Sequence, residues 1–426
     1  MRARFSIFRS GKGADFSARR GCAVALVAVA MAAAAPASHA NMTLHPPDVV
    51  EHQALTNSVA DLGLVMLKSG KAGAANQIVS PMSLASSLGL VHAGAAGRTA
   101  QELSALIAPL TAQDRAFQRE LPGLLTLLRT DTPELTSANR LWLEASLAPS
   151  LPRSYSSAVK ERYAADGVYV SFAQPQDARK TINNWVAEHT NQRIEELLPA
   201  DALTTDTRMV LTNAMHFKAP WATPFAVSAT VEKPFWIDGK TSRLVPTMVK
   251  QMKVRKGKSG GVDFVGIPFL ENRFSMQFFV PPEESSLDDL LKTFSGREMA
   301  GLSYVASEVM CNLEIPRFKI APASVPLKKM LQDLGVHTVF TTQADFTPLL
   351  GDKAKDIALD EVYHSAGITV EEAGVEAVAA TAAVGAVKSL ALPDKAENCQ
   401  VNRPFLFTIT HVATGTPVFM GKVMRP

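Results

Sequence analysis

Residues 405–423 read FLFTITHVATGTPVFMGKV and bring two strand-like runs close to the C-terminus. The run FLFTIT is apolar or β-branched at every position, which is typical of a strand that is covered on both faces. Gly415 and its polar neighbours separate this run from the next and indicate a turn. The stretch therefore predicts two strands of a well-covered sheet.

The strand pattern extends upstream as far as Arg208 and changes there. Four more short apolar runs bounded by turn residues predict strands within residues 208–217, 260–269, 273–281 and 308–320. Before Arg208, apolar residues recur three and four positions apart, which predicts helices within residues 55–70, 81–107, 154–166 and 177–198. Helices followed by strands indicate an α+β fold with a large sheet. No linker rich in Pro, Gly or Ser divides residues 41–426, so we expect a single domain there.

The first forty residues have the three-part order of a secretory signal peptide. Basic residues precede an apolar run from Gly21 to Ala35, and Ser38 and Ala40 occupy the small positions before a cleavage site. The run is short for a membrane span. We therefore expect residues 1–40 to be removed, which leaves a secreted or periplasmic domain with no membrane association. The alanine-rich leader suggests a bacterial source.

The remaining chain is close to neutral. Removal of the leader takes away six of the 43 basic residues and one of the 40 acidic residues, so the formal net charge becomes about −2. This balance does not indicate nucleic-acid binding. The basic residues between Lys250 and Lys258 are expected to lie in a solvated turn rather than in a polyanion site.

Signatures of catalysis and of metal binding are lacking in the sequence. Gly257–Gly261 has the spacing of a nucleophile elbow around Ser259, but the next residues indicate a strand where the elbow requires a helix. A hairpin turn is the expected structure. The nine His residues are scattered, with no pair at metal-ligand spacing. We expect no enzyme, no metal and no cofactor, with a hydrolase that uses Ser259 as an alternative.

Several segments taken together resemble the serpin family, from about Asn76 to the C-terminus. They occur in the order of the family and read NQIVSPMSL (76–84), INNWVAEHTNQRIEELLP (182–199), VLTNAMHFKAPWATPF (210–225), VPTM (245–248), IPFLENRFSM (267–276), EIPRFKI (314–320), ADF (344–346) and NRPFLFTITHVATGTPVFMGKV (402–423). The resemblance implies a serpin-like fold with three β-sheets, about nine helices and an exposed reactive-centre loop at about residues 372–398. In an inhibitory serpin this loop inserts into the main sheet after a protease cuts it.

Residues 371–393, EEAGVEAVAATAAVGAVKSLALP, resemble the hinge of an inhibitory serpin, in which Glu-x-Gly-x-Glu leads into a run of Ala. By this resemblance the hinge residues are Glu372, Gly374, Val375, Glu376, Ala377, Ala379 and Thr381. An inserted strand points alternate side chains into the core, so the inward set starts at Val375 and its members are all small or β-branched. Glu376 would point outward and stay in water.

Val375 departs from the family, which usually has Thr or Ser at this position. An apolar, β-branched residue should insert readily into a sheet. Such a residue would also favour partial insertion before cleavage, which would make the uncleaved protein less reactive.

The scissile bond is expected at Lys388–Ser389, from the usual hinge length of the family counted from Glu372. Lys388 is the only basic residue between Glu372 and Asp394. A Lys before the bond suits a trypsin-like protease, whose specificity pocket ends in an Asp. Leu390 is the alternative, and it would suit chymotrypsin-like proteases.

Two further groups of residues are implied by the resemblance alone. Ser80, Ser83, Asn213 and His364 match the shutter, a polar cluster beneath the centre of the main sheet. Buried polar groups must hydrogen-bond one another, so this cluster has a made and a broken state. Trp221 and Arg317 match the breach, where the loop enters, and an ion pair between Arg317 and Glu372 would hold the top of the sheet closed.

Cys311 and Cys399 remain after the leader is removed, in a compartment where a disulfide would persist. By resemblance they lie on neighbouring strands of one sheet. Sequence does not determine the strand register, and a disulfide requires the two Cα atoms to lie within about 7 Å. Two free thiols and a disulfide both stay open.

The resemblance implies a suicide-substrate inhibitor that acts as a monomer on a serine protease, with a trypsin-like enzyme favoured. The protein is then not an enzyme, because the chemistry belongs to the protease whose acyl-enzyme is trapped. A non-inhibitory serpin that serves as a carrier or chaperone is one alternative, and a cross-class inhibitor of cysteine proteases is another. The small inward residues of the hinge favour the inhibitor.

Overall fold

Helices dominate the first part of the chain and strands dominate the rest, as the apolar periodicity predicts. The computed structural model describes residues 53–69, 76–107, 120–130, 133–150, 152–163, 167–376 and 396–426. The α-helices among them are α1 (Gln53–Ser69), α2 (Pro81–Ala93), α3 (Gly97–Ile107), α5 (Leu121–Thr130), α6 (Arg153–Tyr163), α7 (Pro175–His189), α8 (Leu287–Thr293), α9 (Gly296–Val305), α10 (Lys328–Asp333) and α11 (Thr347–Leu350).

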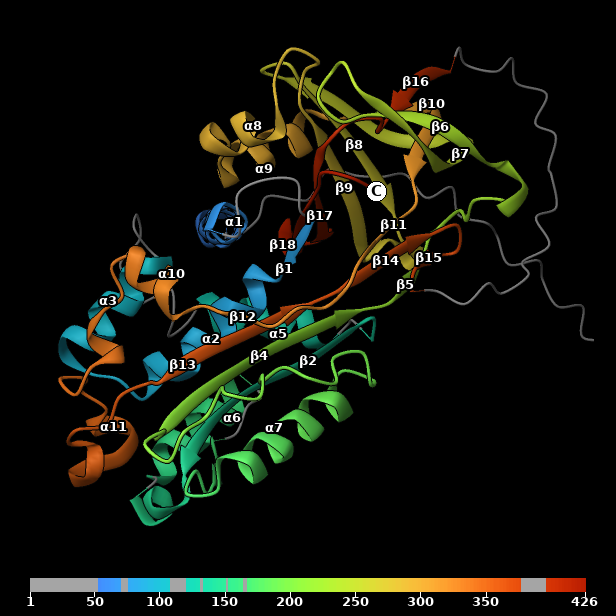
Figure 1. The fold of residues 1–426 in the computed structure, drawn as a ribbon. Helices are drawn as coiled ribbons and strands as arrows, with labels where there is room; N and C mark the ends of the chain where they lie inside the picture. The colour runs from blue at the N-terminus through green and yellow to red at the C-terminus, as the bar shows by residue number, and fades with distance from the viewer. Residues whose placement is uncertain are drawn as a thin grey trace, which may run out of the picture. The chain divides into compact units, whose positions relative to one another are not determined.

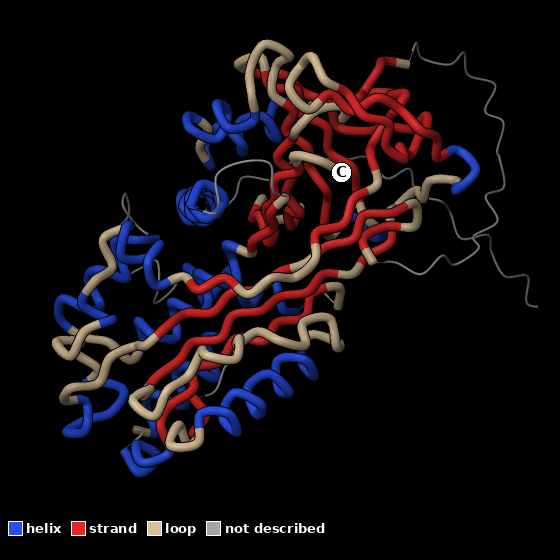
Figure 2. Tube along the Cα trace, in the orientation of Figure 1, coloured by secondary structure: helices blue, strands red, loops and turns tan. Residues whose placement is uncertain are grey.

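The strands of these residues form three sheets (Figures 1 and 2). The nine-stranded sheet contains β1 (Gln77–Val79), β6 (Thr230–Trp236), β7 (Ser242–Ser259), β8 (Val262–Pro268), β9 (Phe274–Val280), β10 (Ser307–Pro316), β16 (Glu397–Gln400), β17 (Phe405–His411) and β18 (Thr416–Val423). The five-stranded sheet has the order β12 (Val325–Pro326), β13 (Glu361–Ala366), β4 (Met209–Phe217), β2 (Leu135–Glu144) and β3 (Gly167–Val170). The four-stranded sheet has the order β11 (Phe318–Ile320), β14 (Ile368–Glu371), β15 (Gly374–Val375) and β5 (Ala219–Pro220). The predicted α+β fold with three sheets is confirmed.

The five-stranded and four-stranded sheets follow one another along the same strands, and together we call them the main sheet. Strand β4 continues after one residue into β5, and β13 continues after one residue into β14. In the five-stranded part β13 and β4 pair directly and in parallel. In the four-stranded part β15 lies between β14 and β5. With strands about 4.8 Å apart, β14 and β5 are therefore separated by about 10 Å.

Helices cover both faces of the five-stranded part. Helix α7 lies along one face, where Ile182 and Val186 join Trp142 of β2 in a buried cluster (Figure 1). Helix α2 lies on the other face and is buried over nearly its whole length. Helix α2 begins after Ser80, whose Oγ accepts a hydrogen bond from the Ser83 N–H, with Pro81 at the first helical position. The start of α2 thus brings two polar side chains against the sheet.

The strands at residues 405–423 lie inside the nine-stranded sheet, as their sequence predicts. Every residue of β17 and of β18 is buried. Strand β17 pairs antiparallel with β18 on one side and with β9 on the other. The FLFTIT run is apolar or β-branched at every position because both of its faces are covered.

The structure differs from the sequence predictions at two helices. The helix predicted within 177–198 ends at His189, because Asn191 and Gln192 have φ angles of 52° and 59°, in the left-handed region that helices do not use. The helix predicted within 81–107 is two helices, α2 and α3.

No helix among the described residues is long and apolar enough to cross a membrane.

The predicted turn positions around Ser259 are partly wrong. Gly260 and Gly261, with φ angles of 58° and 81°, make the expected hairpin turn between β7 and β8. The basic residues between Lys250 and Lys258, however, lie on β7 itself and not in a turn. The apolar residues between them, Met252 and Val254, face the core and extend the strand.

Candidate functional site

The hinge enters the main sheet as a short strand. Val375 of β15 pairs antiparallel with Val370 of β14 and with Ala219 of β5. The Val375 side chain is fully buried and belongs to the larger core cluster. Two residues of the hinge therefore already occupy a strand position, and Val375 points inward as the alternation predicts.

Gly374 is the hinge residue that only glycine can occupy. Its φ angle is 148°, and a Cβ atom built on it would lie 2.2 Å from the carbonyl oxygen of Ala219. That oxygen belongs to the backbone of β5, so it cannot move aside without displacing the strand. The Gly in the Glu-x-Gly-x-Glu pattern thus permits the close approach of β15 to β5.

Glu376 does not stay in water, and the sequence prediction is wrong on this point. Its side chain is only 11% exposed, accepts a hydrogen bond from His216 Nε2 at 2.8 Å and forms an ion pair with Arg193 Nε at 3.0 Å. Arg193 belongs to the segment that follows α7, and His216 belongs to β4. Burial raises the pKa of Glu376, but the His216 hydrogen bond and the Arg193 charge outweigh it and lower the pKa.

The breach residues lie at the corner where the chain turns into β15. Trp221 is buried, stacks on Phe269 with ring centroids 4.6 Å apart, and donates from Nε1 to the carbonyl of Glu371 at 2.9 Å. Arg317 contacts the carboxylates of Glu371 at 3.1 Å and of Glu372 at 3.7 Å. The ion pair expected between Arg317 and Glu372 is present, with Glu371 as an additional partner.

Glu372 is held from a second direction as well. Its carboxylate accepts a hydrogen bond from the Thr230 hydroxyl at 2.7 Å, and its carbonyl accepts one from the Phe225 N–H at 2.9 Å. The side chain is 9% exposed. The first acidic residue of the hinge is thus anchored to the segment between β5 and β6 and to the first residue of β6.

The four shutter residues meet in one buried network. Asn213 Nδ2 donates to Ser83 Oγ at 2.8 Å, and its Oδ1 accepts a hydrogen bond from His364 Nδ1. The Ser80 N–H donates to His364 Nε2 at 3.2 Å, and Ser80 Oγ donates to the carbonyl of Val418 at 2.7 Å. Because one ring nitrogen donates and the other accepts, His364 is neutral. Burial lowers the pKa of His364 to about 4, in agreement with that state.

The network joins strands that are separate in sequence. Asn213 and His364 are direct partners in the parallel pairing of β4 with β13. Separation of these two strands would break their side-chain hydrogen bond, so the shutter is made when the strands are paired and broken when they part.

Comparison with known proteins identifies relatives of this chain. The family model described as Serpin (serine protease inhibitor) matches residues 57–426. The leukocyte elastase inhibitor of Bos taurus is 32% identical over 381 residues, which cover 87% of this chain and 98% of that protein. Iris of Ixodes ricinus is 30% identical over 377 residues, which cover 87% of this chain and 97% of that protein.

The chain belongs to the serpin family. Solved serpin structures share its fold. Serpin48 of the insect Tenebrio molitor superimposes with a TM-score of 0.74 at 27% identity, over 88% of this chain and 99% of that one. Human thyroxine-binding globulin complexed with thyroxine has a TM-score of 0.75 at 24% identity, over 87% of this chain and 98% of that one. These named relatives are animal proteins, so a bacterial source for this serpin stays a prediction.

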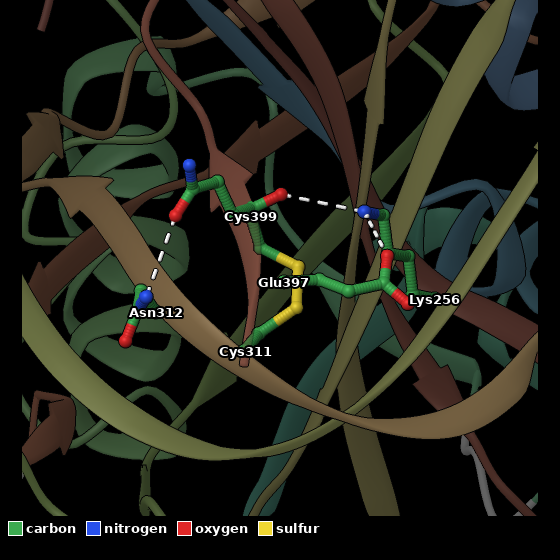
Figure 3. The surroundings of a disulfide bond; sticks show 6 residues. Lys256, Cys311, Asn312, Glu397 and Cys399 are labelled. Carbon is green, nitrogen blue, oxygen red and sulfur yellow. Dashed lines mark hydrogen bonds and ion pairs between the residues drawn. A yellow bond between two sulfur atoms is a disulfide. The ribbon is translucent and has the colours of Figure 1, made fainter. Parts of the chain in front are cut away.

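The two cysteines of the described residues form a disulfide (Figure 3). Strands β10 and β16 are neighbours and run parallel, with Cys399 opposite Leu313. This register brings the Cα atoms of Cys311 and Cys399 to 5.8 Å, within the range that a disulfide requires. The bridge therefore ties β16, the next described strand after β15, to β10 of the nine-stranded sheet.

The basic residues of β7 do not form a free cationic patch. Lys253, Lys256 and Lys258 pair with the carboxylates of Glu308, Glu397 and Asp263 at 3.2, 2.7 and 3.1 Å. Arg255 is buried and donates to the backbone carbonyls of Ser303 and Ala306, at the C-terminal end of α9. Neighbouring carboxylates thus offset much of the charge that a polyanion would bind.

Several predicted residues lie outside the described part of the chain. They are the leader at 1–40, the hinge residues Ala377, Ala379 and Thr381, and the scissile pair Lys388 and Ser389. Ser259 is described and ends β7 at the hairpin turn. Among the described residues, no group of three His, Cys, Asp or Glu could hold a metal ion.

Other residues of the site were not predicted from the sequence. Ser87 accepts a hydrogen bond from Asn213 at 2.7 Å, and Ser83 donates to Asn139 Oδ1 at 2.9 Å. Ser87 follows Ser83 by one helical turn, so helical spacing contains a signal for it. Asn139 of β2, and the two partners of Glu376, have no such local signal because they come from distant elements.

Proposed function

We propose that this serpin is a monomeric suicide-substrate inhibitor of serine proteases. Lys388–Ser389 is the bond that a trypsin-like protease attacks, and loop insertion then traps the acyl-enzyme. The observation that carries the proposal is β15, since the main sheet already accepts two hinge residues between β14 and β5. An inhibitory relative, the leukocyte elastase inhibitor at 32% identity, supports it.

The strand pairings explain why insertion after cleavage would be favourable. For the loop to insert beyond β15, β13 and β4 must separate, which breaks their parallel ladder between residues 361–366 and 210–215. Each inserted residue would then pair antiparallel with a strand on either side. One ladder is lost and two are gained, and antiparallel ladders are slightly more stable per residue than parallel ones.

The side chains of the loop suit the same movement. By the alternation of a strand, the inward positions after Val375 would be Ala377, Ala379, Thr381, Ala383 and Gly385. Such small side chains can enter a packed core without overpacking it. The side chain before the scissile bond is the cation of Lys388, which suits a protease with an Asp in its specificity pocket. Removal of residues 1–40 as a signal peptide would place the inhibitor outside the cytoplasm, in the medium or the periplasm.

A complex that resists SDS tests the proposal. The protein is mixed with trypsin, chymotrypsin, elastase, subtilisin and papain, and the products are separated on denaturing gels. Lys388→Ala should abolish the trypsin complex and leave the melting temperature nearly unchanged. Lys395→Ala removes the next basic residue of the loop and should leave the complex intact.

Each outcome of this experiment assigns a function. Capture of trypsin by Lys388→Ala at the wild-type rate would show that the scissile bond lies elsewhere. A complex with papain alone would indicate cross-class inhibition of cysteine proteases. Cleavage by every protease without any complex would contradict inhibition and favour a carrier or chaperone.

A further inference from the structure

We propose that Arg193 and His216 are positioning residues that act through Glu376 to hold the hinge at two inserted residues. By holding it there they limit the rate at which the uncleaved protein captures a protease. The effect on capture rests on the proposed inhibitory function, whereas the effect on the hinge does not.

Three separate parts of the fold meet at the carboxylate of Glu376. Arg193 comes from the segment after α7, His216 is the penultimate residue of β4, and Glu376 directly follows β15. Both side chains contact the same oxygen, Oε2, at 3.0 Å and 2.8 Å. His216 is only 4% exposed, so its hydrogen bond to the carboxylate is shielded from water.

The contact lies where the strands of the main sheet part. A cavity of about 170 Å³ adjoins Glu376, and its lining includes Met215 and His216 of β4, Ile368 and Thr369 of β14, and Arg193 of the segment after α7. Beyond Glu376, β15 would have to extend between β14 and β4, the two strands that contribute to this lining. The carboxylate of Glu376 therefore occupies the entrance to the insertion path.

The backbone of Glu376 ends the inserted strand. Its φ angle is 47°, in the left-handed region that is unfavourable for a residue with a Cβ atom. Its N–H still donates to the carbonyl of Thr369 at 3.1 Å. Extension of β15 would require Glu376 to become extended, which would move its side chain away from Arg193 and His216. Withdrawal of the hinge would break the same two contacts, so they oppose movement in both directions.

The surroundings of Glu376 contain an excess of positive charge. Lys218 is near enough to lower the pKa of the carboxylate, and Lys319 lines the same cavity. With Arg193 and His216, three cationic or potentially cationic groups act on a single carboxylate. Loss of the negative charge would leave these groups to repel one another, so Glu376→Gln should release the hinge even though it preserves the shape of the side chain.

An inserted hinge restricts the loop that a protease must bind. While β15 is paired, the base of the loop is attached to the sheet and fewer loop conformations can enter an active site. Release returns Gly374 and Val375 to the free loop. Capture should therefore become faster when the contacts of Glu376 are removed.

Hydrogen exchange of the uncleaved, disulfide-intact protein tests the state of the hinge without any protease. In Arg193→Ala, the amides of residues 368–376 should exchange about tenfold faster, which corresponds to about 1.4 kcal/mol. Arg193→Lys should restore most of the protection. Lys258→Ala is the matched control, because it removes an ion pair of similar exposure and length away from the hinge. Lys258 is 62% exposed and pairs with Asp263 at 3.1 Å, and Arg193 is 54% exposed and pairs with Glu376 at 3.0 Å.

The outcomes separate the two parts of the inference. Unchanged exchange in both Arg193→Ala and Glu376→Gln would overturn the positioning role, and the second variant decides the question if the first does not fold. Faster exchange with an unchanged rate of capture would overturn the effect on the protease. Faster exchange in a protein that forms no complex with any protease would uphold the positioning role and contradict the proposed inhibitory function instead.

Discussion

Removal of the disulfide should allow β16 to leave the nine-stranded sheet. The double variant Cys311→Ala, Cys399→Ala breaks the bridge without leaving a free thiol. Both cysteines are almost fully buried, so Ala fills most of the space and adds no polar group. By family resemblance, an uncleaved serpin becomes latent when this strand is released and the loop inserts whole.

The size of the effect follows from the chain that the bridge closes. The two cysteines are 88 residues apart. In the chain-entropy treatment, a loop of this length corresponds to about 4.6 kcal/mol of stabilisation at 25 °C. With a typical unfolding entropy per residue, the melting temperature should fall by about 6 °C.

The contacts that remain on β16 after removal of the bridge are weak. Four residues of β16 pair with one strand only, β10. The Lys256–Glu397 ion pair of 2.7 Å is half exposed on the Glu side, and such pairs contribute about 0–1 kcal/mol. The bridge is therefore the main restraint on this strand.

The assay is loss of activity on mild heating. Wild type and the double variant are held about 10 °C below their own melting temperatures, and protease capture is measured over hours. The variant should convert to an inactive, uncleaved, more heat-resistant monomer, whereas the wild type should stay active. Lys256→Ala, which keeps the bridge, is the control. Loss of activity at the same rate in both proteins would contradict the prediction. Thiol titration of the wild type, denatured without reduction and lacking its leader, would also contradict it by finding two free thiols per chain.

Three further predictions concern the main sheet. Ala379→Arg should convert the inhibitor into a substrate, because an unpaired charge would enter the core. The cleaved variant should then gain much less in melting temperature than the cleaved wild type, and equal gains would contradict the inward position. The pKa of His364 is about 4 in the fold, below the ordinary value of 6.5, so the unfolded chain binds more protons than the fold as the pH falls below 6.5. The free energy of unfolding should therefore fall by about 2 kcal/mol between pH 7 and pH 5. Urea unfolding measures this, and His364→Gln should lack that part of the pH dependence. Gly374→Val should prevent β15 from pairing, because its Cβ atom would lie 2.2 Å from the Ala219 carbonyl; hydrogen exchange across 368–376 as slow as in the wild type would refute this.

The sequence alone determined the features that depend on neighbouring residues. Apolar runs such as FLFTIT predicted covered strands, and Gly260–Gly261 predicted the hairpin turn, because periodicity and turn chemistry are local properties of the chain. The shutter residues were implied by the resemblance to the serpin family, through motifs that each span only a few residues.

Only the tertiary structure decided which distant residues meet. The disulfide depends on the register that brings Cys399 opposite Leu313 of a neighbouring strand. The burial of Glu376 depends on a segment after α7 and on β4, which lie about 160–180 residues away in sequence. Strand register and contacts across layers follow from the packing of the whole chain, so local patterns predicted Glu376 to point outward but not that it would be covered.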